Sequence, residues 1–236
     1  MNFAWSWPLW LLILPPIAGC AQHALLLPAP SLAPTAVSGN YSQMLAVAQT
    51  DPAGTDWTAL RAAYAASPAY DPTTGDGPAM RDCIAATNTE NWPEAAAEAQ
   101  IAINQNFMDL RAHIFAVRAE TELGNAAAAN REAPIAIGML HIILATGTGT
   151  SPATAYHVLA TSEEYDIIRP FGFRPLGLQG LKNMNGHWYD VLGIYSPQSG
   201  ASAAMWFNVD VSFARETAIA TGQAKVIPVS SAMVAQ

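Results

Sequence analysis

Two stretches that share a turn signal, ENWPEAAAEAQIAI at residues 90–103 and GNAAAANREAPIAI at residues 124–137, decide the helical part of the fold. Glu90-Asn91 in the first aligns with Gly124-Asn125 in the second, at a spacing of 34 residues. Asparagine is a favoured capping residue at the start of a helix, and small residues such as Ala95 follow at helical spacing. The pattern therefore predicts helical hairpins that repeat along the chain.

The spacing is the period of the tetratricopeptide repeat, and a Gly-Asn turn followed by Ala-x-x-Ala resembles its turn between helices. We expect the helical region to cover residues 55–146, with Thr55 or Asp56 capping a helix that starts at Trp57. Pro134 should kink or interrupt the last helix, because proline inside a helix removes a backbone hydrogen bond. Arrays of this kind usually need about three units, so we expect a following β unit to supply the missing cover.

The character of the sequence changes after Gly147-Thr148-Gly149. Residues 147–213 predict a small antiparallel β unit, because Asn185-Gly186 is a strong signal for a two-residue hairpin. One short helix is expected inside this unit, with Ser162 as its cap and Pro170 after its end. The predicted fold class is α+β, with helical hairpins followed by a β unit packed on them, and residues 214–236 are expected to be a tail. The predicted strands are Ala155–Leu159, Leu176–Lys182, His187–Tyr195 and Ala203–Val209.

Residues 1–20 have the features of a lipoprotein signal peptide. An apolar run from Phe3 to Ile17 is shorter than the roughly 20 residues needed to span a bilayer. It ends in Ile17-Ala18-Gly19-Cys20, which resembles the lipobox of bacterial lipoproteins. That resemblance implies cleavage before Cys20 and its lipidation, with acyl chains such as palmitate. The n-region, Met1-Asn2-Phe3, departs from the pattern because it has no Lys or Arg, and an ordinary cleaved signal or an uncleaved anchor are the alternatives. Residues 21–54 would then be a flexible tether to the membrane. We expect a lipid-anchored protein of the cell envelope, on the outer membrane or the periplasmic face if the source is Gram-negative.

Charge and cysteine content exclude several classes of protein. Lys and Arg total 10 against 18 Asp and Glu, giving a net charge of −8 with no basic stretch, so nucleic acid is not expected as a partner. If Cys20 is lipidated, Cys83 has no intrachain partner, and we expect it to be buried in a helix. No HExxH, Cys-x-x-Cys or Gly-x-Ser-x-Gly motif occurs, and we expect no catalytic residues, no metal site and no cofactor.

One polar cluster on the predicted β unit is a candidate functional site. His187 and Asp190 could act as general base and orienting acid, or join Glu164 as metal ligands. Their spacing of three places them on opposite faces of a regular strand. A structural alternative is that Asp190 is buried and satisfied by Arg169, Arg174 or backbone donors. The full candidate cluster consists of Glu164, Tyr165, His187, Tyr189, Asp190 and Asn208.

Several short segments together resemble an uncharacterised bacterial envelope family, the domain of unknown function numbered 4919. The resemblance covers about residues 55–213 and implies an exported, often lipid-anchored protein, helical and then β, with no assigned activity. The segments that carry it are Asp56-Trp57-x-x-Leu60-Arg61-x-x-Tyr64, Ser67-Pro68-Ala69-Tyr70-Asp71-Pro72, Ala112-His113, Leu123-Gly124, Ser151-Pro152-x-Thr154-Ala155-Tyr156, Glu163-Glu164-Tyr165, Gly186-His187-x-Tyr189-Asp190-Val191 and Phe207-Asn208-Val209-Asp210.

Taken together, these observations favour a membrane-anchored lipoprotein that acts as a non-catalytic binding or scaffolding module, with a protein or peptide as candidate partner. One alternative is an envelope enzyme that uses His187, Asp190 and Glu164, which requires those three side chains to meet in one pocket. Another alternative is a purely structural envelope protein, which would lack any concave pocket.

Overall fold

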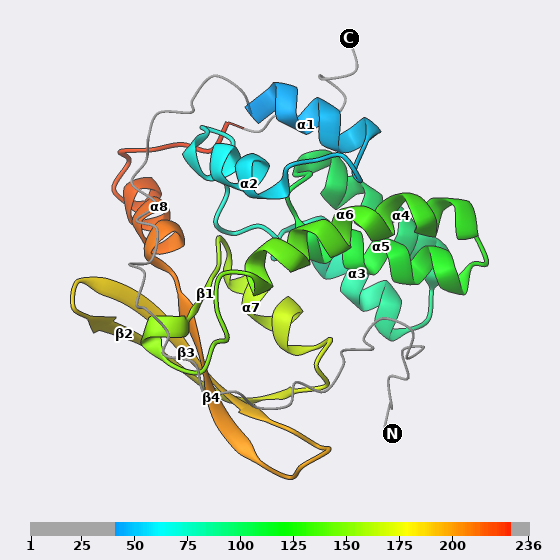
Figure 1. The fold of residues 1–236 in the computed structure, drawn as a ribbon. Coiled ribbons are helices and arrows are strands. Elements are labelled where there is room, and N and C mark those ends of the chain that lie inside the picture. Colours follow the sequence, from blue (N-terminus) through cyan, green and yellow to red (C-terminus); the bar gives the residue numbers. More distant parts are fainter. Residues whose placement is uncertain (1–40, 228–236) are drawn as a thin grey trace, which may run out of the picture. The chain divides into compact units, whose positions relative to one another are not determined.

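The computed structural model describes residues 41–227. The predictions for the signal peptide, for Cys20 and for the tether as far as residue 40 lie outside the described residues, as does the end of the tail from residue 228. Within the described part the helices are α1 (Tyr41–Thr50), α2 (Trp57–Ala66), α3 (Pro78–Asn88), α4 (Trp92–Gln105), α5 (Leu110–Glu122), α6 (Ala126–Leu144), α7 (Thr161–Ile168) and α8 (Asp210–Ala220). A 3-10 turn, η1 (Pro152–Thr154), and the strands β1 (Tyr156–His157), β2 (Arg174–Met184), β3 (His187–Tyr195) and β4 (Ser202–Asn208) complete the fold. The predicted class, α+β with helical hairpins before a sheet, is confirmed (Figure 1).

The strands form one sheet in the order β1-β4-β3-β2. Strands β2, β3 and β4 are antiparallel neighbours, whereas β1 runs parallel to β4. The prediction of a wholly antiparallel unit is therefore wrong at β1, which is also shorter than predicted. Parallel neighbours need a long connection, and here the chain from α7 through β3 supplies it. The turn from β2 to β3 is Asn185-Gly186, with φ of 55° and 84°, as a two-residue hairpin requires.

The consecutive helices from α3 to α6 pack against one another as hairpins. The two turns that the 34-residue spacing aligns have the same conformation. Glu90 and Gly124 both adopt positive φ, 58° and 72°. The N–H of Asn91 donates to Ala86 at 2.9 Å, and that of Asn125 donates to Glu120 at 2.8 Å. In each turn this hydrogen bond closes the preceding helix, and the residue with positive φ reverses the chain. The 34-residue spacing therefore relates structurally equivalent positions.

Helix α6 continues without a break through Pro134, so of the two predicted effects, a kink or an interruption, the interruption is wrong. The residues on both sides of Pro134 form one long helix, which buries Ile135, Met139 and Ile143 in the core. Burying that apolar stripe stabilises the helix enough to offset the backbone hydrogen bond that proline removes, since a proline costs about 3 kcal/mol in a helix interior.

Besides α7, which the sequence predicts, two helices lie outside the predicted helical region. Helix α1 falls inside the segment expected to be tether, and buries Leu45 and Ala48 completely. Helix α8 extends into the expected tail. There, the Arg215 guanidinium donates to the Tyr70 carbonyl at 3.2 Å, which ties the C-terminal part to the loop after α2. No helix within residues 41–227 has the length and apolar character needed to cross a membrane.

A single apolar cluster joins the helices and one face of the sheet. From the sheet it takes Leu192 of β3 and Phe207 of β4, both fully buried. Helix α7 adds Ile167 and Ile168, and contacts both α5 and β2. Figure 1 shows α7 between the hairpins and the sheet. The buried side chains of α7 therefore set the orientation of the sheet relative to the helices.

The two aligned turns give a matched pair of substitutions. We expect Gly124→Ala to lower the free energy of unfolding by about 1 kcal/mol, because a side chain is disfavoured at positive φ. A Cβ on Gly124 would meet nothing within 4 Å, so the loss is conformational rather than steric. Glu90→Gly should raise the free energy of unfolding by about 0.5 kcal/mol, since it removes the same strain. Urea denaturation measures both, and effects of the same sign would contradict the equivalence of the turns.

Candidate functional site

The structure divides the predicted polar cluster into two groups on opposite faces of the sheet. Side chains alternate along β3, so His187 and Tyr189 lie on one face and Asp190 on the other. Asp190 faces α7 together with Leu192, whereas His187 is mostly exposed at the start of the strand. The prediction that the six residues form one site is therefore wrong. A general base at His187 oriented by Asp190 is not assembled.

The inner group joins Glu164, Tyr165 and Asp190 through one residue that the sequence did not single out, Gln179. The amide nitrogen of Gln179 donates to Asp190 Oδ2 at 2.6 Å and faces Glu164 Oε2 at 3.3 Å. Its amide oxygen accepts the hydroxyl of Tyr165 at 2.9 Å. Neither of the expected partners of Asp190, Arg169 and Arg174, bonds to it in the described part of the chain, and the half-buried carboxylate is bound by an amide instead.

A bulge in β2 places Gln179 where it can reach both carboxyl groups. The pairing of β2 with β3 shifts between Pro175 and Gln179, and Gly177 adopts φ of 70°. Proline cannot donate to the ladder, and glycine accepts the positive φ of the bulge at no steric cost. Bulges re-aim the side chains that follow them. Gln179 thus lies opposite Leu192, on the face that turns toward α7.

Glu164 is the most perturbed group of the inner cluster. Its side chain is fully buried, and burial together with the nearby Asp190 and Glu163 carboxylates raises the pKa of Glu164 to about 9. Burial and Asp190 also raise the pKa of Glu216. Within residues 41–227, Glu164 Oε1 and Asp190 Oδ1 are buried and have no hydrogen-bond partner. Two carboxyl groups that share a donor, each with one unsatisfied oxygen, are unusual in a folded protein.

The other two acidic residues of α7 are fully compensated. Arg61 forms a bidentate pair with Glu163, at 2.6 and 2.7 Å, and Glu163 also accepts the N–H of Leu159. Arg111 donates to Asp166 at 3.1 Å, and both side chains are buried. Burial raises the pKa of Asp166 to about 6, while the two arginines beside it, Arg111 and Arg169, act in the opposite direction. Of the three carboxyl groups on α7, Glu164 is the one without an arginine partner in the described part of the chain.

The outer group is centred on Asp210, the first residue of α8. His187 Nδ1 lies 2.7 Å from Asp210 Oδ2, which also accepts the Asn208 side-chain amide at 3.1 Å. The Trp188 N–H donates to Asp210 Oδ1 at 2.6 Å. Burial opposes ionisation of Asp210, but these hydrogen bonds outweigh it and hold the pKa of Asp210 below its usual value. The contact between His187 and Asp210 holds the His187 ring at the exposed rim of the sheet.

His157 and Asp210 were missed at the sequence level, although both lie near the predicted His187 and Asn208. His157 pairs in register with Asn208, and burial lowers its pKa, with the His187 charge acting in the same direction and Asp210 against it. The segment Phe207-Asn208-Val209-Asp210 includes Asp210, but only as part of the family resemblance, which gave this residue no role. No local signal identifies His157 or Gln179, because the sheet brings them to their neighbours. No group of three or more His, Cys, Asp or Glu in the described part of the chain is arranged to hold a metal ion.

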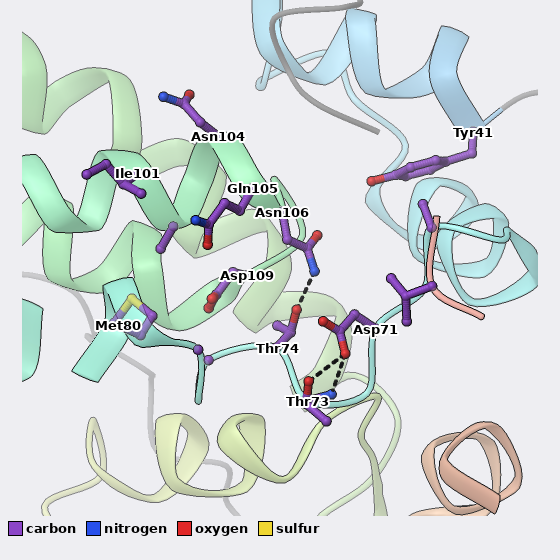
Figure 2. A pocket seen from close by; sticks show the side chains of 15 residues that line it. Tyr41, Asp71, Thr73, Thr74, Met80, Ile101, Asn104, Gln105, Asn106 and Asp109 are labelled. Atoms are coloured by element: carbon purple, nitrogen blue, oxygen red, sulfur yellow. Dashed lines mark hydrogen bonds between the residues drawn. The ribbon is translucent and has the colours of Figure 1, made fainter. Parts of the chain in front are cut away.

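A cleft of about 610 Å³ opens between α4 and the loop after α2. In Figure 2 the side chains of Gln105, Asn106 and Asp109 face Asp71 and Thr74 across it. Asn106 bonds to Thr74, and Asp71 Oδ1 accepts the N–H of Thr73 at 2.9 Å, so the loop wall is held in place. Burial raises the pKa of Asp109, which also caps α5 through the N–H of Ala112. The remaining lining residues are Tyr41, Ala69, Thr73, Gly75, Gly77, Met80, Ile101, Ala102, Asn104 and Val226.

Comparison with known proteins places the chain in one family. Residues 45–217 match the model of the domain of unknown function DUF4919. Because the match covers most of the chain, this protein belongs to that family. No curated protein and no solved structure matches it.

The burial of Glu164 predicts a pH dependence of stability. The unfolded chain releases this proton near 4.5, whereas the folded chain holds it to about 9, so the unfolded state binds fewer protons between these values. The free energy of unfolding should therefore fall as the pH rises through this range. We expect Glu164→Gln, measured at pH 7.5 in chelator-containing buffer, to raise the free energy of unfolding by at least about 1 kcal/mol. The variant should also show a flatter profile from pH 5 to 9, and an unchanged slope would contradict the assignment.

Proposed function

We propose that this chain is a bacterial envelope lipoprotein, anchored through Cys20, whose folded part binds a ligand rather than catalysing a reaction. The observation that supports binding is the cleft between α4 and the loop at residues 69–77. Its volume of about 610 Å³ lies in the range typical of small-molecule and cofactor sites, roughly 300–1,000 Å³. The lipobox at Ile17-Ala18-Gly19-Cys20 supports the anchor.

The lining of the cleft favours a ligand that brings hydrogen-bond donors or positive charge. Among the described residues that line it, none is Lys, Arg or His, whereas Asp71 and Asp109 are acidic. Amide and hydroxyl groups from Asn104, Gln105 and Thr73 add acceptors. An exposed Ile101 supplies an apolar contact. We infer that a peptide segment with basic and apolar side chains is the natural class of ligand.

Tetratricopeptide-like character of the helical hairpins is part of this proposal. It is supported by the two equivalent turns at Asn91 and Asn125 and by the packing of α3 to α6 in sequence order. Helical repeats of this kind present surfaces to partner chains. The C-terminal end of α4, one helix of the proposed repeat, lines the cleft.

Gly77 offers a direct test of the cleft. It lines the cleft in an extended conformation, and a Cβ added there would meet nothing within 4 Å. We expect the full-length chain in detergent to bind the peptide Ala-Lys-Leu-Lys-Ala more tightly than Ala-Glu-Leu-Glu-Ala, by about tenfold in Kd. Gly77→Phe should weaken binding of the lysine peptide by about tenfold or more, measured by titration calorimetry.

Gly77→Ser is the matched control, because serine at the capping position of α3 should keep or improve stability while leaving the cleft open. Equal affinity for the two peptides, or equal binding by the phenylalanine and serine variants, would remove the cleft from the proposal. The anchor would be unaffected by that result.

The anchor is tested separately by labelling cells with a radioactive fatty acid. We expect the wild-type chain to take up label and to fractionate with membranes, and Cys20→Ala to lose both properties. Cys83→Ala is the control, since Cys83 is buried in α3 and should not affect lipidation. Label that survives in Cys20→Ala would refute the anchor.

A further inference from the structure

We propose that Glu164 and Asp190, together with Gln179, form a binding site for a divalent cation that prefers oxygen ligands, with Ca²⁺ as the favoured ion. This inference is independent of the cleft and of the membrane anchor. It concerns the contact between α7 and the sheet. Arg61 and Arg111 bind the other two acidic residues of α7.

Two unsatisfied oxygens point to a cation at this contact. Glu164 Oε1 and Asp190 Oδ1 are both buried without a hydrogen-bond partner within residues 41–227. The side chain of Glu164 has no exposure to solvent. Their other oxygens, Oε2 and Oδ2, face the same nitrogen of Gln179, so the two carboxyl groups converge. Ionised carboxyl groups at this contact need a compensating cation or a proton, and no arginine or lysine bond to either group is present in the described part of the chain.

Gln179 can change from a donor to a ligand by turning its amide. In the present arrangement its nitrogen faces both carboxyl groups and its oxygen accepts the Tyr165 hydroxyl. Rotation of the amide by half a turn would direct the oxygen at the cation, while the nitrogen donates to the Tyr165 hydroxyl, which can accept as well as donate. Only the side chain turns, so the backbone pairing of Gln179 with Leu192 is left undisturbed.

The donor set selects the kind of ion. Carboxylate and amide oxygens suit hard cations, and the absence of a nearby ring nitrogen or thiolate from this group argues against zinc or copper. Two carboxylates and one amide oxygen supply fewer ligands than Ca²⁺ takes, so water would complete the shell, as it does at many calcium sites. Ca²⁺ accepts irregular geometry, whereas Mg²⁺ demands a near-ideal octahedron. An irregular pair of carboxyl groups on a helix and a strand therefore favours Ca²⁺.

Thermal unfolding of the full-length chain in detergent tests the site. Protein treated with chelator and then dialysed is titrated with CaCl₂, with MgCl₂, and with NaCl at matched ionic strength. We expect Ca²⁺ to raise Tm along a saturable curve, by about 5 °C at a hundredfold excess over Kd. Mg²⁺ should have a weaker effect, and NaCl should not reproduce the curve.

Substitutions at the site give opposite results with and without the ion. Glu164→Gln should be more stable than the wild type without Ca²⁺, so a lost response cannot be ascribed to unfolding. It should lose the Ca²⁺-dependent rise in Tm, and so should Asp190→Asn. Glu216→Gln is the matched control, because Glu216 lies near Asp190 without bonding to Gln179, and it should keep the rise.

The outcomes separate a metal ion from a proton. A saturable rise in the wild type and in Glu216→Gln, absent in Glu164→Gln, supports the site. No saturable rise in the wild type, or a rise that survives in Glu164→Gln, overturns it. If the wild type shows no saturable rise and its stability changes with pH but not with Ca²⁺, a single proton on Glu164 neutralises the pair.

Discussion

The burial of three carboxyl groups on one short helix is the constraint on which the rest of this structure depends. Glu163, Glu164 and Asp166 of α7 are all buried between the helical hairpins and the sheet. Removing a charged carboxylate from water costs several kcal/mol unless an opposite charge or hydrogen bonds replace the lost solvation. The helix is therefore stable in its place only where each group finds a partner.

The three carboxyl groups are compensated in different ways. Two of them have a structural role, and the third belongs to the proposed cation site. Glu163 and Asp166 lie close together around the helix axis, and each meets an arginine from the helical region, Arg61 and Arg111. These pairs fix α7 against α2 and α5. Glu164 projects away from both and meets Gln179 and Asp190 from the sheet. The first two contacts build the fold, whereas the third leaves two oxygens that a cation or a proton can neutralise.

Local signals predicted those parts of the fold that depend on a few neighbouring residues. The Asn185-Gly186 hairpin follows from the positive φ that both residues tolerate, and the turns at Glu90 and Gly124 follow from helix-ending geometry. The same local reasoning failed for Pro134, where packing of α6 in the core outweighs a proline. It also failed for α1, whose short apolar stripe carries little signal until the helices around it bury Leu45.

The sequence by itself determined the fold class, the hairpin turns, the family and the identity of several polar residues that matter. It could not determine which of those residues meet. Arg61 and Glu163 are 102 positions apart and Arg111 and Asp166 are 55 apart, so no local pattern records their pairing. Only the tertiary structure decided that His187 joins Asp210 while Asp190 joins Gln179 and Glu164. The physical reason is that strand alternation separates His187 from Asp190, while a bulge in a neighbouring strand and the burial of α7 bring distant polar groups into one place.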